Sequence, residues 1–430
     1  MNAKILILGA SAENTGFIQR LIELGLHVVC LDKHPTLDKD FVSQNIKQLT
    51  CIECDFINTQ EVIDLVVKEH ITHTIALPIG RSLVALGKIN DHFNFAGPSF
   101  DAIDHLTDKV KFHQLCKDLS LNDAQYLYLN DGHTNTISAQ ISSIEQALSY
   151  PVIVKPSLGS GSLGVRYIAN RAELLAYQVP ERFINSPLLI EQAISGDEYS
   201  CNLFIDKHQK INLLGIFKKE ISSIPYRQEI AYFVDDFSEV FDALLPSIQK
   251  IVHQLNIKQS FLNADIIMSE LGKHYIIDIS TRLSGNNLLK LLCFTNNNPI
   301  EIYCKEVLFN QSANYNKVQE AGALRFFSFN HNIVYGAAHG YGAAHGFGAR
   351  EHNSTNSPSQ SHSSPEVDSI FSPDERLNII ELKNSMVLGK SYGAMQTGSD
   401  TNRGYIFAKG KDLASANELT CRYLQALAQF

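Results

Sequence analysis

A lysine at the end of a predicted strand stands directly before a loop rich in glycine and serine. Residues 152–165 read VIVKPSLGSGSLGV, so Lys155 closes the apolar run, and Gly159, Gly161 and Gly164 follow it. Glycines let backbone amides approach an anion closely, and the lysine adds a positive charge. A Walker A loop would end in Gly-Lys-Ser/Thr and lead into a helix, whereas a second apolar run follows here. The pattern predicts a hairpin loop over phosphate groups, with a plain flexible turn as the alternative.

Two aspartates face each other in a second predicted hairpin, which is centred on Leu271-Gly272. In that register Asp265 lies opposite Asp278, and Asn263 and Ser280 share their face because side chains alternate along a strand. Two like charges about 5 Å apart destabilise a strand pair unless something neutralises them. Mg²⁺ would do so, since it prefers carboxylate and phosphate oxygens. The spacing therefore predicts a metal site, with a protonated carboxyl group or another register as alternatives.

Further charged residues flank these two hairpins. Arg282 follows the second aspartate closely and can hold a phosphoryl group or a carboxylate through two parallel hydrogen bonds. A structural ion pair with an aspartate is the alternative. Upstream, Glu191 and Glu198 bracket a short linker containing Gly196. Such a linker can present backbone groups to a base edge and a carboxylate to ribose hydroxyls, although a solvated turn is the simpler interpretation.

Alternating strands and helices precede these features and would form their scaffold. A strand at 4–8, a helix at 17–24 and a strand at 27–31 make a βαβ unit with parallel strands. Its turn lacks the full G-x-G-x-x-G pattern, and only Asp32 supports dinucleotide binding, so we interpret the segment as a scaffold domain. Strands are also expected at 72–77, 151–156, 165–169, 188–192, 202–205, 212–217, 261–268, 274–279 and 404–408, and helices at 106–119, 243–255 and 412–427.

Composition limits the class of protein. The chain has 430 residues, 44% of them hydrophobic, which suits several lobes. A net charge of −9 gives no basic face, so we expect no nucleic-acid partner. Because no apolar stretch is long enough for a bilayer and the first apolar run is too short for a signal peptide, we expect no membrane partner and a cytoplasmic protein. The eight scattered cysteines, including a lone pair at Cys51 and Cys54, are expected to be reduced thiols.

Residues 335–365 differ from the rest of the chain. They contain YGAAHG twice in tandem and then a run rich in serine, asparagine, proline and histidine. Such a segment cannot bury enough apolar surface to order itself, so we predict a disordered insertion. Metal binding by its histidines is the alternative.

In their order and spacing these features resemble the ATP-grasp superfamily, which includes biotin carboxylase, the purine-pathway carboxylases, D-alanine–D-alanine ligase and L-amino-acid ligases. The resemblance runs from residue 1 to about residue 330 and resumes over 377–430. It implies an α/β fold with α+β lobes, in which a Rossmann-like domain precedes the ATP-grasp core. The expected parts are an N-terminal domain at 1–105, a linker helix and mobile lid subdomain at 106–190, a catalytic core at 191–330, the insertion at 331–370 and a small C-terminal lobe at 371–430.

The resemblance also implies roles for single residues. The ATP phosphates would contact Lys109, Lys155, Ser157, Gly159, Ser160, Gly161, Ser162 and Gly164. The adenine ring and ribose would contact Glu191, Gln192, Ala193, Ile194 and Glu198. Mg²⁺, or Mn²⁺ in its place, would be held by Asp265, Asp278 and Ser280. Arg282 and Lys155 would be the catalytic residues, with Arg282 stabilising the acyl phosphate and the tetrahedral intermediate.

Two positions depart from the family pattern. The family usually has glutamate and then asparagine where this chain has Asp278 and Ser280. Aspartate reaches less far than glutamate, and a serine hydroxyl is a poorer metal ligand than an amide oxygen. We therefore expect a second magnesium ion to be held more loosely here than in the family.

The implied reaction joins a carboxylate to an amine at the expense of ATP, through an acyl phosphate and with release of ADP and phosphate. Small-molecule acids and amines would be the partners, together with a second copy in a homodimer, and Arg227 and Glu229 are candidates for specificity. One alternative is a purine-pathway-type carboxylase or formyl transferase. Its phosphorylated acceptor would need several arginines, and Arg81 and Arg282 are the two candidates. A non-catalytic ATP-binding sensor is the other, motivated by Asp278 and Ser280.

Overall fold

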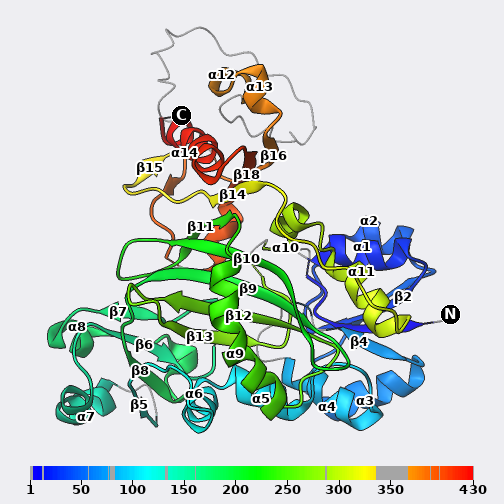
Figure 1. Ribbon diagram of the computed structural model, residues 1–430, viewed down its shortest axis with the longest axis horizontal. Helices are drawn as coiled ribbons and strands as arrows, with labels where there is room; N and C mark the ends of the chain where they lie inside the picture. Colours follow the sequence, from blue (N-terminus) through cyan, green and yellow to red (C-terminus); the bar gives the residue numbers. More distant parts are fainter. Residues whose placement is uncertain are drawn as a thin grey trace, which may run out of the picture. The chain divides into compact units, whose positions relative to one another are not determined.

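The computed structural model describes residues 3–11, 14–56, 58–75, 77, 83–130, 134–159, 161–285, 288–335, 367–387, 389–396 and 398–429 (Figure 1). Contacts divide the chain into two compact units, one formed by 1–219 with 234–319 and the other by 220–233 with 320–430. Most of the predicted insertion lies outside the described residues. Within those residues, no helix has the length and apolar character needed to cross a membrane.

The first unit opens with the predicted βαβ arrangement. Four parallel strands lie in the order β3-β2-β1-β4, which confirms the parallel pairing. They are β1 (Lys4–Leu8), β2 (His27–Asp32), β3 (Leu49–Glu53) and β4 (His73–Ile75), with helices α1 (Thr15–Glu23), α2 (Lys39–Gln44), α3 (Thr59–Lys68) and α4 (Leu83–Phe93). The carboxylate of Asp32 accepts hydrogen bonds from the backbone N–H groups of Ala10 (2.7 Å) and His34 (2.9 Å). Asp32 thus closes the turn after β1, which supports the scaffold interpretation.

A second, antiparallel sheet carries the glycine-rich loop. Its strands lie in the order β5-β8-β6-β7 and comprise β5 (Tyr126–Leu129), β6 (Val152–Pro156), β7 (Arg166–Ile168) and β8 (Leu188–Gln192). Helices α7 (Thr134–Ala147) and α8 (Arg171–Ala176) accompany it, and their buried residues form one core with the strands. β6 and β7 are paired neighbours, so the predicted hairpin after Lys155 is confirmed.

A third set of strands in this unit carries the two aspartates. The order is β13-β12-β9-β10, with β9 (Asp197–Ile205), β10 (Ile211–Ile221), β12 (Ser260–Met268) and β13 (His274–Ser280). Alternate residues of β9, such as Cys201 and Leu203, share a buried core with Ile248 and Ile251 of α9 (Ser238–Gln254). The other face of β9 therefore carries Glu198, Ser200 and Asn202. The unit also contains α10 (Leu288–Leu291), α11 (Pro299–Tyr303) and short helical turns at Leu292–Thr295 and Cys304–Leu308.

The helix predicted at 106–119 is wrong as one continuous element. The structure has α5 (Phe100–Thr107) and α6 (Lys109–Asp118), separated by Asp108 with φ −92° and ψ 110°. The Asp108 carboxylate accepts hydrogen bonds from the N–H groups of Val110 (3.0 Å) and Lys111 (3.4 Å). An aspartate at this position caps the new helix, so the chain turns there and Lys109 opens α6.

The second unit has its own antiparallel strands. β11 (Glu229–Val234), β14 (Ala321–Phe326), β18 (Gly404–Gly410) and β16 (Ile379–Asn384) lie in that order. Residues of β14 and β18 pack on the long helix α14 (Leu413–Gln429). Inside this unit, buried Arg325 pairs with Glu220 at 2.7 Å and also donates to Asn417. The remaining elements are β15 (Ile333–Val334), β17 (Ser391–Tyr392), α12 (Val367–Ile370), α13 (Pro373–Arg376) and a turn at Gly398–Arg403.

The linker before β9 depends on a glycine. A Cβ added at Gly196 would lie 2.1 Å from the carbonyl oxygen of Met268, the last residue of β12. We expect Gly196→Ala to destabilise the protein by at least ~2 kcal/mol, since overpacking against backbone adds to the strain of a positive φ. The control is Gly272→Ala, which has φ +73° and no atom within 4 Å of the added Cβ, and which should cost only ~1 kcal/mol. Calorimetric Tm values compare the two, and equal losses would contradict the backbone clash.

Candidate functional site

The hairpin of β12 and β13 brings the two aspartates together as predicted. Asp265 pairs with Asp278, and Asn263 pairs with Ser280. The path to this register differs from the prediction, because Met268 pairs with His274 and a β-bulge then adds one residue, Ile277. As a consequence Ile276 rather than Ile277 belongs to the buried core. The carbonyl oxygen of Ile277 instead accepts a 3.4 Å hydrogen bond from Lys155.

One face of this sheet is polar around the hairpin. Asp265 has Ser200 as its neighbour on β9, and Asn263 has Asn202. The Asn263 side-chain amide donates to the Ser200 hydroxyl at 2.9 Å. Glu198, the predicted ribose carboxylate, lies two residues before Ser200 and therefore shares this face with the aspartates. The predicted ribose and metal residues thus lie in adjacent rows of one surface.

Two lysines neutralise the aspartates in the structure. The Lys219 ammonium lies 2.7 Å from Asp265, and the Lys109 ammonium lies 3.3 Å from Asp278. The Lys219 side chain is only 3% exposed, whereas that of Asp278 is 47% exposed. The two lysines therefore already neutralise part of the repulsion between the aspartates. That repulsion alone does not require a metal ion, so metal binding needs support of another kind.

Lys219 was missed by the sequence reasoning, although β10 carries a signal for it. Lys219 is buried like Phe217 two residues earlier, whereas Lys218 is part-exposed and pairs with Asp197 at 2.7 Å. In a strand, such alternation places Lys219 on the same side as Phe217 and Lys218 on the other. A lysine at a buried position of a strand requires a carboxylate partner nearby.

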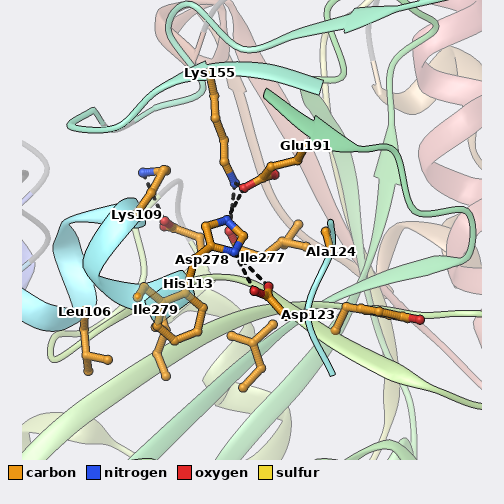
Figure 2. Close-up of a pocket in the computed structure, with 13 residues that line it drawn as sticks. Leu106, Lys109, His113, Asp123, Ala124, Lys155, Glu191, Ile277, Asp278 and Ile279 are labelled. Carbon is orange, nitrogen blue, oxygen red and sulfur yellow. Dashed lines mark hydrogen bonds and ion pairs between the residues drawn. The ribbon is translucent and has the colours of Figure 1, made fainter. Parts of the chain in front are cut away.

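A chain of buried ion pairs connects the second sheet with α6 (Figure 2). The Lys155 ammonium lies 2.7 Å from Oε1 of Glu191, and the His113 Nε2 lies 2.6 Å from the same oxygen. The other ring nitrogen of His113 lies 2.8 Å from both carboxylate oxygens of Asp123. Burial by itself would raise the pKa of Glu191, but the charge of Lys155 and the hydrogen bond from His113 outweigh it and hold that pKa at about 2. Glu191 is therefore ionised.

These groups line a pocket between the second sheet, α6 and β13 (Figure 2). The lining residues are Leu106, Lys109, Phe112, His113, Asp123, Ala124, Lys155, Glu191, Tyr275, Ile276, Ile277, Asp278 and Ile279. The structure thus brings together four of the predicted site residues and adds His113 and Asp123. The signal for His113 was its place four residues after Lys109, which puts both on one face of α6.

The glycine-rich loop begins next to α6. The backbone N–H of Lys109 donates to the carbonyl oxygen of Ser157 at 3.2 Å, and its ammonium donates to that of Gly159 at 3.3 Å. Further along, Gly161, Ser162 and Gly164 have φ values of +65°, +55° and +79°. Left-handed residues at these positions turn the chain back toward β7, which explains Gly161 and Gly164. The predicted Ser160 lies outside the described residues.

The linker after Glu191 is held by backbone groups of the residues just before β6. The side-chain amide of Gln192 donates to the carbonyl oxygen of Pro151 at 3.1 Å, and its oxygen accepts from the N–H of Ser149 at 3.3 Å. The N–H of Ala193 also donates to Pro151. Gln192 therefore fixes the linker through its side chain, while Ala193 and Ile194 are part-exposed. Their contacts with a base remain a prediction.

Arg282 lies near both aspartates at the end of β13. Its guanidinium donates to the carbonyl oxygen of Leu283 at 2.7 Å. Burial lowers the pKa of Arg282, and the charges of Asp278 and Asp265 act in the opposite direction. Of the two other candidates for substrate contacts, Arg81 lies outside the described residues and Arg227 belongs to the second unit.

The donor set suits a hard cation that takes its remaining ligands from a substrate. Ser280 Oγ is buried beside Asp278 and has no hydrogen-bond partner among the described residues. The same residues contain no group of three histidine, cysteine or acidic side chains placed to hold a metal ion. Two carboxylates and an unpartnered hydroxyl are a partial oxygen shell, which is the kind that Mg²⁺ completes with phosphate oxygens and water. The residues therefore fit a nucleotide-bound magnesium ion better than a metal held by protein alone.

Comparisons with known proteins place these features in a family. A model of the ATP-grasp domain family matches residues 148–289. A D-alanine–D-alanine ligase from Polaromonas naphthalenivorans (strain CJ2) is 27% identical over 225 residues, which are 50% of this chain and 68% of that protein. The crystal structure of an L-amino acid ligase from Bacillus licheniformis has a TM-score of 0.73 at 16% identity and covers 98% of each chain. That of N5-carboxyaminoimidazole ribonucleotide synthetase from Thermotoga maritima has a TM-score of 0.65 at 14% identity, covering 99% of this chain and 98% of the other.

The matched segment spans the glycine-rich loop, the ion pair of Lys155 with Glu191 and the hairpin with its two aspartates. The structural likeness covers nearly the whole chain, at identities that show the fold alone. The chain therefore has the ATP-grasp fold, and its residues 148–289 match the ATP-grasp domain family.

Proposed function

We propose that the chain is an ATP-dependent carboxylate–amine ligase, which forms an amide or peptide bond through an acyl phosphate and releases ADP and phosphate. The observation that carries the proposal is the meeting of Lys109, Lys155 and Glu191 with the aspartate hairpin in one region of the first unit. The names of two relatives support it, since D-alanine–D-alanine ligase and L-amino acid ligase both join amino acids. The identity of the acid and of the amine is left to experiment.

The charges of the site favour a polyphosphate. Its cations are Lys109, Lys155, Lys219 and Arg282, to which His113 adds a positive charge when it is protonated, and its carboxylates are Asp123, Glu191, Glu198, Asp265 and Asp278. The positive and negative side chains therefore balance, and the lysines beside the glycine-rich loop are the groups that can attract an anion. The Lys109 ammonium donates to the carbonyl oxygen of Gly159 at the start of the glycine-rich loop, and the Lys155 ammonium donates to that of Ile277 in β13. Each lysine can therefore exchange its carboxylate partner for a phosphate oxygen. We assign the phosphates to this loop, as Ser157 to Gly164 predict.

The adenine and ribose would lie along the linker between β8 and β9. Glu191 and Gln192 are fixed by the second sheet, and Glu198 stands on the polar face of the third. The linker between them carries Ala193 and Ile194, which are part-exposed and able to contact a base. Glu198 would then accept hydrogen bonds from ribose hydroxyls.

Asp265, Asp278 and Ser280 would hold Mg²⁺ or Mn²⁺, which when bound supplies positive charge to the β- and γ-phosphates. Lys109 and Lys219, which neutralise the two aspartates in the structure, would then turn to phosphate or substrate oxygens. This exchange of partners is why a carboxylate pair with two lysines remains compatible with metal-dependent chemistry.

The reaction would proceed in two steps. A carboxylate oxygen of the acid attacks the γ-phosphorus in line, the bond to the β-phosphate oxygen breaks, and ADP leaves. The amine nitrogen then attacks the carbonyl carbon of the acyl phosphate, phosphate leaves, and the nitrogen gives up a proton. Neither step needs a side-chain nucleophile, because positioning and charge stabilisation suffice. Lys155 would stabilise the transferring phosphoryl group, and Arg282 would stabilise the oxyanion of the tetrahedral intermediate.

Phosphate release from Mg-ATP, measured with a matrix of amino acids and dipeptides as acids and amines, tests the proposal. We expect release only when an acid and an amine are both present, with ADP as the nucleotide product. Turnover that needs bicarbonate or formate and a phosphorylated amine would instead favour the purine-pathway type of enzyme. Nucleotide binding without turnover on any acid would favour the sensor, and AMP as product would refute the acyl phosphate.

Removal of one hairpin charge should stop the chemistry. We expect Asp278→Asn to lower kcat by about 100-fold or more and to raise the magnesium concentration needed for half-maximal rate, because one charged oxygen ligand is lost. Glu270→Gln is the matched control, since Glu270 is exposed at the tip of the same hairpin. Magnesium titrations of the rate measure both, and parallel losses in the two variants would argue against a metal role for Asp278.

The two adjacent lysines of β10 should differ sharply. Lys219→Met leaves a part-buried Asp265 without its cation, so we expect a loss of about 3 kcal/mol in stability together with a loss of activity. Lys218→Met breaks only the exposed pair with Asp197 and should cost less than 1 kcal/mol. Urea unfolding and turnover of both variants provide the comparison. Equal effects would mean that burial of Lys219 has no bearing on the site.

A further inference from the structure

A buried histidine of α6, His113, contacts the carboxylate of the Lys155–Glu191 ion pair in the second sheet. His113 is 5% exposed, stacks on Tyr126 with ring centroids 4.1 Å apart, and has each ring nitrogen against a different carboxylate. Nε2 lies 2.6 Å from Glu191, and Nδ1 lies 2.8 Å from each oxygen of Asp123. None of the chemistry described above requires this side chain, yet it contacts the carboxylate that holds Lys155.

The contacts determine the protonation of the ring. An ionised carboxylate only accepts hydrogen bonds, so a nitrogen that faces one must carry a hydrogen. Nδ1 is equally far from both Asp123 oxygens, which fits one N–H shared between them. With both nitrogens donating, His113 is an imidazolium. Burial alone would lower the pKa of His113, but the hydrogen bonds to Asp123 and Glu191 outweigh it and raise that pKa above its ordinary value.

This proton affects Lys155 through a shared acceptor. Oε1 of Glu191 receives both His113 and Lys155, at 2.6 and 2.7 Å. With His113 charged, His113 and Lys155 together balance the charges of Glu191 and Asp123. Lys155 then supplies only part of the positive charge that these two carboxylates need. With His113 neutral, Glu191 would keep Lys155 as its cation, Asp123 would lose the charge of His113, and one ring nitrogen would turn a lone pair toward an oxygen. Lys155 would then be held more tightly by Glu191, and the net charge of the pocket would become more negative by one.

Several other titratable groups surround His113. Lys109, Asp278 and Tyr275 line the same pocket from α6 and β13. Tyr126 stacks on the ring from β5, and burial raises the pKa of its hydroxyl. Cys116 lies on the next turn of α6, and burial raises the pKa of its thiol as well. Among these neighbours, His113 is the group whose ordinary pKa, about 6.5, lies nearest to neutral pH.

We propose that His113 is a positioning residue, which as an imidazolium between Asp123 and Glu191 keeps Lys155 available to nucleotide phosphates and so makes nucleotide affinity depend on its own proton. The inference rests on the proposed nucleotide site. Because the pKa of His113 is raised in the folded protein, the effect is fully present well below that raised value and is lost as the pH rises through it. Affinity should therefore fall with increasing pH.

The test measures ADP binding to the full chain by calorimetry between pH 7 and 9.5 without divalent metal, so that the aspartate hairpin contributes no metal ligands. For the wild type we expect the association constant to fall by up to about tenfold per pH unit above the pKa of His113. In the double variant His113→Gln/Asp123→Asn, a neutral amide pair replaces the charged pair and can still donate to Glu191. Its affinity should vary much less with pH.

His253→Gln is the matched control, because His253 is an exposed histidine of α9 that does not line the pocket. It should keep the pH dependence of the wild type. If the double variant keeps it as well, the proposal is wrong while the nucleotide site stands. If the wild type binds no ADP at any pH, the proposed function fails and the inference fails with it.

A second measurement is made on the wild-type protein, and a variant is needed only to assign the NMR signals of His113. Nitrogen-15 NMR of the wild-type imidazoles reports whether both nitrogens of His113 carry hydrogen, and His113→Gln identifies its signals. We expect the doubly protonated form at pH 7 and a titration midpoint that rises when ADP is bound. A neutral tautomer at pH 7, or a midpoint that ADP does not move, would overturn the proposal.

Discussion

Pairing of buried and part-exposed carboxylates with lysine or histidine cations is the constraint on which this site depends. An isolated charge inside a protein costs several kcal/mol even after relaxation, so every acid in the pocket must have a partner. Lys155 and His113 serve Glu191, Lys109 serves Asp278, and Lys219 serves Asp265. These pairs join α6, the second sheet and the hairpin within the first unit. The secondary structure around them is arranged so that each cation and its acid come from different elements.

The same pairs would allow the proposed site to receive a nucleotide. A polyphosphate offers oxygens that compete with the carboxylates for the lysines, and a magnesium ion competes with the lysines for the carboxylates. Binding would therefore exchange partners without exposing an unpaired charge. The β-bulge at Ile277 contributes, because it places a backbone carbonyl within reach of Lys155 and returns Asp278 to its position opposite Asp265.

Local pattern predicted much of this arrangement. Strand alternation and the turn at Leu271-Gly272 predicted the pairing of Asp265 with Asp278, and the apolar runs predicted the strands at 151–156, 165–169 and 188–192 around Lys155. The register near the turn was off by one residue, because a bulge has no signal in alternation that a single sequence reveals. The helix break at Asp108 was missed since an aspartate within a periodic segment fits both a solvated helix face and an N-cap.

The partners of the charged residues could not be predicted. His113, Asp123 and Lys219 meet their counterparts only after helices and sheets have packed, at sequence separations that no periodicity encodes. The repulsion between Asp265 and Asp278 correctly predicted that both carboxylates need neutralisation. In the structure the neutralising charges are those of Lys219 and Lys109. Part of the predicted phosphate loop, Ser160, and most of the predicted insertion lie outside the described residues.

The central claim, that a carboxylate is activated by phosphoryl transfer, has one most direct test. An acid substrate labelled with ¹⁸O in its carboxylate is turned over with Mg-ATP, and the products are examined by ³¹P NMR. The acyl-phosphate route transfers one carboxylate oxygen to phosphorus, so each inorganic phosphate released should carry one ¹⁸O. Label appearing in AMP, or phosphate that carries none, would contradict the account.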